Sequence, residues 1–259
     1  GKQMVPGISP DGEHIAWVRD NNIFVSDVYG SERLQITRDG SFNEIINGHA
    51  DWVYEEEFSL SRAWEWSHDG RYLAWIRFDE AHVREFNMVR YGTLYPVDYR
   101  FKYPKAGEEN ARVSLHVWDR IKNQQINLDT GGDAEAEAYI PRIYWSPGTQ
   151  ELAFLRLNRH QNRMELMLGD IASGQSRPLY VESNIYYVDL PLIVLFLEDG
   201  KHFLISSEKS GYRHLYLFDM QGRQQRALTS GDYDVQRFVG LDQQRSQLYY
   251  LARKNSPMT

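Results

Sequence analysis

Short apolar runs separated by polar turns recur along the chain, at intervals of roughly 50 residues. Each copy of the pattern has an apolar residue, a polar turn and a second apolar run, and the copies begin at Ile8, Trp66, Trp145, Phe196 and, in degenerate form, Leu241. Three of the turns contain Asp-Gly, at Gly12, Gly70 and Gly200. Because glycine accepts a positive φ without steric cost, Asp-Gly is typical of tight hairpins. Each copy therefore predicts a β-hairpin.

Two further strands are expected after each of the first four copies. Short apolar runs that end in Asp lead through a turn to another apolar stretch, and they occupy residues 22–27, 113–119, 164–170 and 214–219. Four short strands per repeat are the sequence pattern of a β-propeller. We predict an all-β chain that forms part of a β-propeller, with about four to five four-stranded blades. A β-sandwich is the alternative, although it would not require the repeat.

The longest departure from the repeat lies between the second and third copies, at residues 79–107. Long insertions of this kind either carry a function or dock another molecule. An ordinary long hairpin is the other interpretation.

Composition excludes several classes of function. The chain has 259 residues, a formal net charge of -7 and no cysteine. The acidic balance argues against a nucleic acid as partner, since phosphate binding needs a concentrated basic face. The absence of cysteine excludes disulfides, thiolate nucleophiles and zinc–thiolate sites. The histidines show none of the spacings typical of metal ligands. We expect no metal site and no cofactor. The segment 129–137 could hold calcium, but it lacks the alternating ligands of an EF-hand and is better read as a solvated loop.

One acidic run stands out, because Glu55, Glu56 and Glu57 follow one another directly. Such runs are usually solvated surface. Here, however, they lie within the segment 51–58, which also holds Trp52, Tyr54 and Phe58. Burying unpaired like charges among aromatic residues is costly, so the cluster must be solvated or matched to a cation. Arg62, Arg142 and Arg213 are candidates to balance Glu55 or neighbouring carboxylates.

The segment Asp51-Trp-Val-Tyr-Glu-Glu-Glu-Phe58 resembles a motif of the dipeptidyl peptidase IV family of serine peptidases. Segments 103–107, 157–162 and 211–215 resemble the same family, so the resemblance spans nearly the whole chain. It implies that Glu56 and Glu57 bind the free α-ammonium of a peptide substrate, with Glu55 and Tyr54 in support. It also implies that the arm at residues 91–107 forms a homodimer contact in the full-length protein.

The resemblance further implies that residues 1–259 are a fragment of an N-terminal, eight-bladed propeller. An α/β-hydrolase domain with a Ser-Asp-His triad is expected downstream of residue 259, since the chain has no G-x-S-x-G nucleophile motif. The fragment would then be inactive by itself. It would recognise substrate N-termini and gate access in a serine-type dipeptidyl peptidase that releases Xaa-Pro or Xaa-Ala dipeptides. Such a protein is expected to be exported, to a bacterial periplasm or the cell surface.

Two other functions are open. A non-catalytic propeller that serves as a scaffold for protein–protein interaction would carry similar hairpins but would not need the acidic run. A propeller glycosidase would need two carboxylates at a defined separation across the substrate, which adjacent glutamates do not provide.

Overall fold

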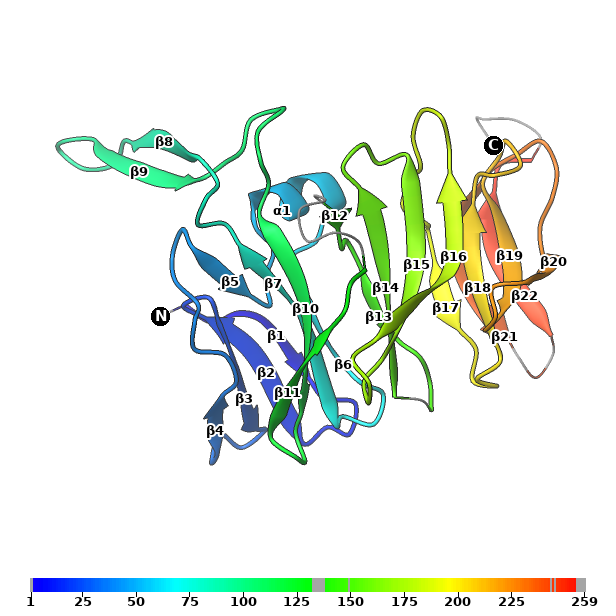
Figure 1. The fold of residues 1–259 in the computed structure, drawn as a ribbon, viewed down its shortest axis with the longest axis horizontal. Helices are drawn as coiled ribbons and strands as arrows, with labels where there is room; N and C mark the ends of the chain where they lie inside the picture. The colour runs from blue at the N-terminus through cyan, green and yellow to red at the C-terminus, as the bar shows by residue number, and fades with distance from the viewer. Residues whose placement is uncertain (1, 132–137, 149, 243, 245, 255–259) are drawn as a thin grey trace. The chain divides into compact units, whose positions relative to one another are not determined.

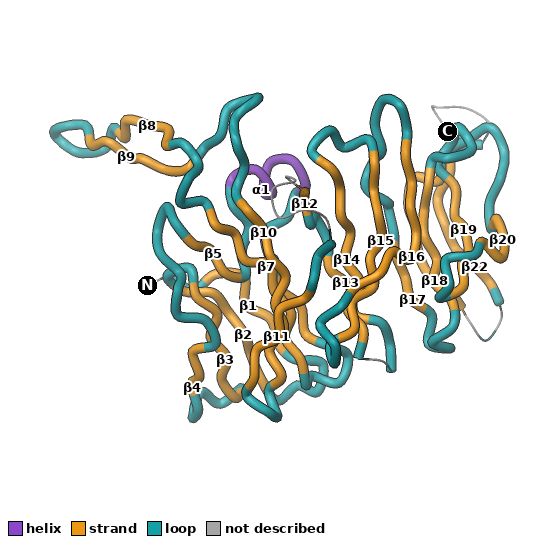
Figure 2. The backbone as a smooth tube through the Cα atoms, viewed as in Figure 1, coloured by secondary structure: helices purple, strands orange, loops and turns teal. Residues whose placement is uncertain are grey.

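The computed structural model describes residues 2–131, 138–148, 150–242, 244 and 246–254. Within these residues the chain is built of antiparallel β-strands and one short helix (Figures 1 and 2). The predicted all-β class and the predicted succession of blade-like sheets are confirmed. The chain forms two compact units, of which the first contains Gly1–Trp145, Glu151–Arg159 and Met167–Arg177, and the second contains the remainder.

The first sheet of unit 1 is a four-stranded meander in the order β1-β2-β3-β4. Its strands are β1 (Met4–Ile8), β2 (His14–Arg19), β3 (Asn22–Asp27) and β4 (Arg33–Gln35). The predicted hairpin is present, because Ile8 pairs with Ile15 and Gly12 in the turn has a φ of +75°.

The second sheet of unit 1 is centred on β7 (Tyr72–Asp79). One edge of β7 pairs with β10 (Arg112–Asp119), which in turn pairs with β11 (Gln124–Leu128). The other edge is shared by two short strands, β5 (Ile45–Asn47) and β6 (Trp64–Trp66). Since β5 pairs with residues 77–79 and β6 pairs with residues 73–75, these two strands divide a single strand position of the sheet.

The helix α1 (Trp52–Phe58) lies in the excursion between β5 and β6. The chain leaves and re-enters the sheet at one point, where Gly48 donates to the Ile76 carbonyl and accepts from the Ala63 amide. Gly48 has a φ of +79°, and a Cβ atom there would lie 2.9 Å from the Ile23 side chain. The split in the strand therefore requires glycine at this position.

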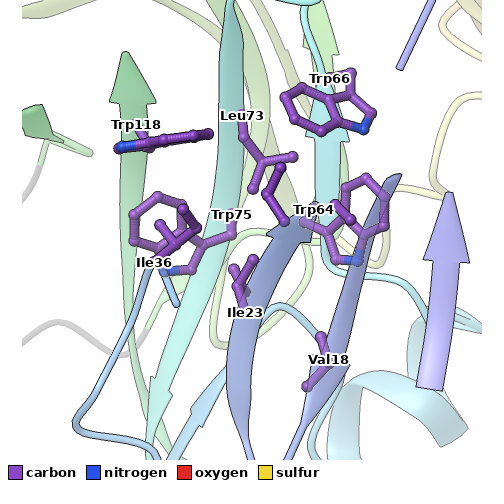
Figure 3. Packing of buried hydrophobic residues seen from close by; sticks show 10 residues of the cluster. Val18, Ile23, Ile36, Trp64, Trp66, Leu73, Trp75 and Trp118 are labelled. Carbon is purple, nitrogen blue, oxygen red and sulfur yellow. The ribbon is translucent and has the colours of Figure 1, made fainter. Parts of the chain in front are cut away.

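The core of unit 1 lies between these two sheets (Figure 3). The first sheet and the residue that follows β4 contribute aliphatic side chains, and the second contributes four tryptophans and a leucine; the cluster is Ala16, Val18, Ile23, Val25, Ile36, Trp64, Trp66, Leu73, Trp75 and Trp118. Every member is at most 8% exposed. Large aromatic side chains thus fill the space between adjacent blades, where they bury much apolar area.

The insertion at residues 79–107 forms a second hairpin, with strands β8 (Glu85–Arg90) and β9 (Val97–Lys102). It projects away from the sheets of unit 1 (Figure 1). All six residues of β8 are exposed. The hairpin therefore adds nothing to the core. The name arm is used below for this hairpin and its base, which include the predicted contact segment at residues 91–107.

Unit 1 also contains β12 (Ala138–Tyr139) and β13 (Ile143–Trp145), which both pair with β14 (Glu151–Asn158). The strands β15 (Arg163–Asp170) and β16 (Ser176–Ser183) contribute residues to both units. Unit 2 contains the meander β17 (Val194–Phe196), β18 (His202–Ser207), β19 (His214–Asp219) and β20 (Gln224–Ala227). It also contains the hairpin β21 (Val235–Asp242) and β22 (Gln247–Ala252), where the degenerate fifth copy was predicted.

Substitutions of Leu73 and Leu94 test how much the core between the two sheets contributes to the free energy of unfolding. Leu73 is fully buried, whereas Leu94 at the tip of the arm is 91% exposed. We expect Leu73→Ala to lower the free energy of unfolding by about 2–5 kcal/mol, because it leaves a cavity. Leu94→Ala should change it by less than about 0.5 kcal/mol. Urea unfolding measures both values, and equal losses would contradict the placement of this core.

Candidate functional site

The acidic run forms the seven-residue helix α1 rather than a turn or a strand. Asp51 is its N-cap, and the Asp51 carboxylate accepts a hydrogen bond of 2.9 Å from the amide of Tyr54. Ser59 ends the helix in the left-handed conformation, with a φ of 50°. A side-chain acceptor at the N-cap satisfies an amide that has no partner inside the helix. Asp51, directly before the first residue of the helix, was the available sequence signal for it.

Tyr54 and Phe58 fix the buried face of α1. They are one helical turn apart, and their exposed fractions are 1% and 3%. The Tyr54 ring lies edge-on to Phe78, with 4.8 Å between ring centroids, and the Phe58 ring lies edge-on to Tyr139 at 5.2 Å. The Tyr54 hydroxyl accepts a hydrogen bond of 2.8 Å from the amide of Ile140, and burial raises the pKa of Tyr54 well above its ordinary value. Tyr54 therefore anchors the buried face of the helix.

Arg142 fixes the other end of α1. Its guanidinium donates a hydrogen bond of 2.7 Å to the carbonyl of Phe58, and a cation at a helix C-terminus is favourable. Arg62 and Arg213, two of the three candidates to balance Glu55 or neighbouring carboxylates, pair with acidic residues outside the run. Arg62 pairs with Glu65 at 2.7 Å, and Arg213 pairs with Glu208 at 2.5 Å and with Asp189 at 3.3 Å. Arg62 lies three residues from Glu65 along the chain, and Arg213 lies five residues from Glu208, so both have an acidic partner nearer in sequence than Glu55.

Glu55, Glu56 and Glu57 all have exposed side chains. Consecutive helical residues project about 100° apart, so Glu56 and Glu57 flank one direction away from the buried face. Their carboxylates can therefore converge on one cationic group outside the helix. Glu55 projects about 100° from Glu56, on the side opposite to Glu57, and can add to the negative potential around the pair.

Two carboxyl groups are buried at or near the N-terminus of α1. Asp51 and Glu80 are each 7% exposed. Burial raises the pKa of Asp51 to about 6. Burial, together with the charge of Asp51, raises the pKa of Glu80 to about 7, and the ammonium group of Lys102 acts in the opposite direction. No sequence motif predicts this pair, because Glu80 directly follows a strand and carries no recognisable pattern around it.

One group of potential metal-ligating side chains occurs among the described residues, namely Asp11 and Glu13 in the turn after β1 and His14 at the start of β2. The Arg120 guanidinium lies 3.6 Å from the Asp11 carboxylate and 3.2 Å from the His14 ring, so a side-chain cation already contacts two of the three. Residues 132–137 of the calcium candidate 129–137 lie outside the described residues. In the part of the chain that the structure describes, no helix has the length and apolar character needed to cross a membrane.

Comparison with known proteins gives consistent matches. The sequence profile of the family described as "Dipeptidyl peptidase IV (DPP IV) N-terminal region" matches residues 1–259. A protein of Aspergillus fumigatus named "Probable dipeptidyl peptidase 4" is 30% identical over 261 residues, which is 95% of this chain and 34% of that protein. The crystal structure of Porphyromonas gingivalis dipeptidyl peptidase 4 is similar with a TM-score of 0.92 and 39% identity, over 99% of this chain and 36% of that one. The chain thus spans about a third of the length of these relatives.

The raised pKa of Glu80 predicts a pH-dependent effect of the Glu80→Gln substitution. Because the folded-state pKa of about 7 exceeds the ordinary value of 4.5, ionisation of Glu80 destabilises the fold as the pH rises through this interval. We expect Glu80→Gln to raise the free energy of unfolding at pH 8, by on the order of 1 kcal/mol relative to its effect at pH 5. Denaturant unfolding at both pH values measures this difference. Glu198→Gln, at an exposed site, is the control; the same effect of Glu80→Gln at both pH values would refute the expectation.

Proposed function

Because the chain belongs to the dipeptidyl peptidase IV family, we propose that it is the substrate-recognising N-terminal part of a serine exopeptidase. The full-length protein would release Xaa-Pro or Xaa-Ala dipeptides from free peptide N-termini. In this proposal Glu56 and Glu57 bind the α-ammonium of the substrate. The observation that carries it is the pair of exposed carboxylates on a short helix whose other face is firmly anchored.

The chemistry of the pair suits an α-ammonium group. The reference pKa of an α-amino group is near 8, so the group is largely cationic at neutral pH and donates hydrogen bonds to carboxylates. An acylated amine carries no charge and would lose this interaction. Fixed carboxylates also measure the substrate, because a reactive serine at a fixed distance would cut only after the second residue.

The remaining parts of the proposal follow from the family. A hydrolase domain downstream of residue 259 would supply the serine, aspartate and histidine, and this chain alone would be inactive. The N-terminal domain would also restrict access to extended peptides and exclude folded proteins. The protein would be exported, to a bacterial periplasm or the cell surface.

The carboxylate pair is tested in the full-length protein with Gly-Pro-chromophore substrates that have a free or an acetylated N-terminus. We expect Glu56→Gln and Glu57→Gln each to reduce the preference for the free amine by roughly 2–4 kcal/mol in kcat/KM, since each removes a charge-assisted hydrogen bond. Glu55→Gln should have a smaller effect. Glu109→Gln, outside α1 and with a side chain that is 74% exposed, is the matched control. Wild-type discrimination in both variants would leave the acidic run as solvated surface and favour a scaffold role.

The arm is the second part of the proposal, as a contact between two copies of the full-length protein. Its tip exposes apolar side chains, and Leu94 and Tyr95 are 91% and 76% exposed. Exposed apolar groups on a projecting hairpin are typical of an interaction surface.

Light scattering after size-exclusion chromatography measures the oligomeric state. We expect a dimer for the wild type and a monomer, or a dimer weakened at least about 10-fold, for Leu94→Glu, because burying an unpaired charge in an interface is unfavourable. Ile121→Glu is the control, since Ile121 is also exposed, at 71%, but lies in the turn between β10 and β11. A monomeric wild type, or a Leu94→Glu variant that dimerises like the control, would rule out the arm as the contact.

A further inference from the structure

Trp52 connects α1 to the base of the arm. Its side chain is 44% exposed and therefore adds little to the core. The Trp52 ring lies 4.9 Å from the Tyr103 ring and 5.8 Å from the Phe101 ring, measured between centroids. Phe86 completes the cluster, at 5.5 Å from Tyr103 and 6.1 Å from Phe101. These four rings, called the arm-base cluster, join the first residue of α1 to both strands of the arm.

The base of the arm is itself firmly held. The Lys102 ammonium group donates hydrogen bonds of 3.1 Å and 2.8 Å to the carbonyls of Ala81 and Val83. The amide of Tyr103 donates to the carbonyl of Arg84 at 3.0 Å, which extends the pairing of the hairpin. Val83 is 4% exposed. The rings that contact Trp52 are therefore mounted on fixed backbone.

The buried charges at this junction do not provide a second link. Asp51, the N-cap of α1, and Glu80, at the start of the arm insertion, are both carboxyl groups, and the charge of Asp51 raises the pKa of Glu80. Lys102, at the end of β9, acts in the opposite direction on the same group. The arm-base cluster is therefore the contact that joins the N-terminus of α1 to the arm.

The position of Trp52 on α1 relates this contact to the carboxylates. Trp52 and Glu56 are four residues apart and so lie on the same side of the helix. Tyr54 and Phe58 hold the helix from the opposite side. A helix of seven residues has little stability of its own, so contacts on both sides are needed to fix its rotation about its axis.

We propose that Trp52 is a positioning residue for Glu56, held in place by the arm-base cluster, so that the arm sets the affinity of the site for the substrate ammonium group. This inference rests on the proposed function of Glu56. Loss of the Trp52 contacts would let the helix rotate, and the Glu56 carboxylate would no longer meet the ammonium group with good geometry. A displacement of about 1 Å at such a contact is sufficient for a large loss of rate.

A double-mutant cycle in the full-length protein tests the inference. The measured quantity is the ratio of kcat/KM for Gly-Pro-chromophore with a free and with an acetylated N-terminus, and titration of the reactive serine with a fluorophosphonate probe gives the concentration of folded enzyme. We expect Trp52→Ala to lower this ratio about 10-fold, and Trp52→Phe to retain most of it. If Trp52 acts through Glu56, adding Trp52→Ala to Glu56→Gln should cause no further loss.

Two further variants complete the design. Tyr103→Ala removes the contact from the arm side and should reproduce the effect of Trp52→Ala without a substitution in α1 itself. Tyr29→Ala, at a tyrosine that is 90% exposed in the turn between β3 and β4, should leave the ratio unchanged. Losses that add fully in the double mutant, or wild-type ratios for Trp52→Ala and Tyr103→Ala, would overturn the inference while Glu56→Gln alone still shows its effect. An unchanged ratio in Glu56→Gln would instead overturn the proposed function, and the inference with it.

Discussion

Burial of the Tyr54 and Phe58 rings is the interaction on which the acidic helix depends. A helix of seven residues with three adjacent glutamates would not form alone, because nucleation is unfavourable and the last carboxylate lies near the negative end of the helix dipole. The two rings pack edge-on against Phe78 and Tyr139, and Arg142 offsets the negative end of the helix through its hydrogen bond to Phe58. Packing of the two buried rings therefore supplies the stability that the sequence of the helix lacks.

The position of α1 follows from the divided strand. Since β5 and β6 share one edge of β7, the excursion between them begins and ends within a sheet that is otherwise complete. The arm is inserted in the same sheet, between β7 and β10. Two insertions in one blade thus come together in space, and the rings of Trp52 and Tyr103 fill the contact between them. A blade can carry such insertions because its core residues, among them Leu73 and Trp75, lie elsewhere along β7.

Most strands could be predicted from the sequence, because the blades repeat the same local pattern of apolar runs and polar turns, three of which contain Asp-Gly. The turns at Gly12, Gly70 and Gly200 all have positive φ, as this chemistry requires. The helix could not be predicted from apolar periodicity, since two buried residues in seven do not define a period. The partners of Trp52 and the burial of Glu80 were also out of reach. Both depend on contacts between segments that are distant in sequence, and neither aromatic residues nor a single glutamate reveal their partners.

The placement of the charges explains why the carboxylate pair is compatible with a stable fold. Loss of hydration on burial raises the pKa of Asp51, and burial together with the charge of Asp51 raises the pKa of Glu80. Glu56 and Glu57 lie on the exposed side of α1, while the groups that hold the helix in place are aromatic, backbone or cationic. Both carboxylates thus lie at the surface of a helix whose position is set by other groups. The negative potential then remains available to a cationic ligand, and the rigidity of the helix, rather than burial of the charges, determines how well that ligand is held.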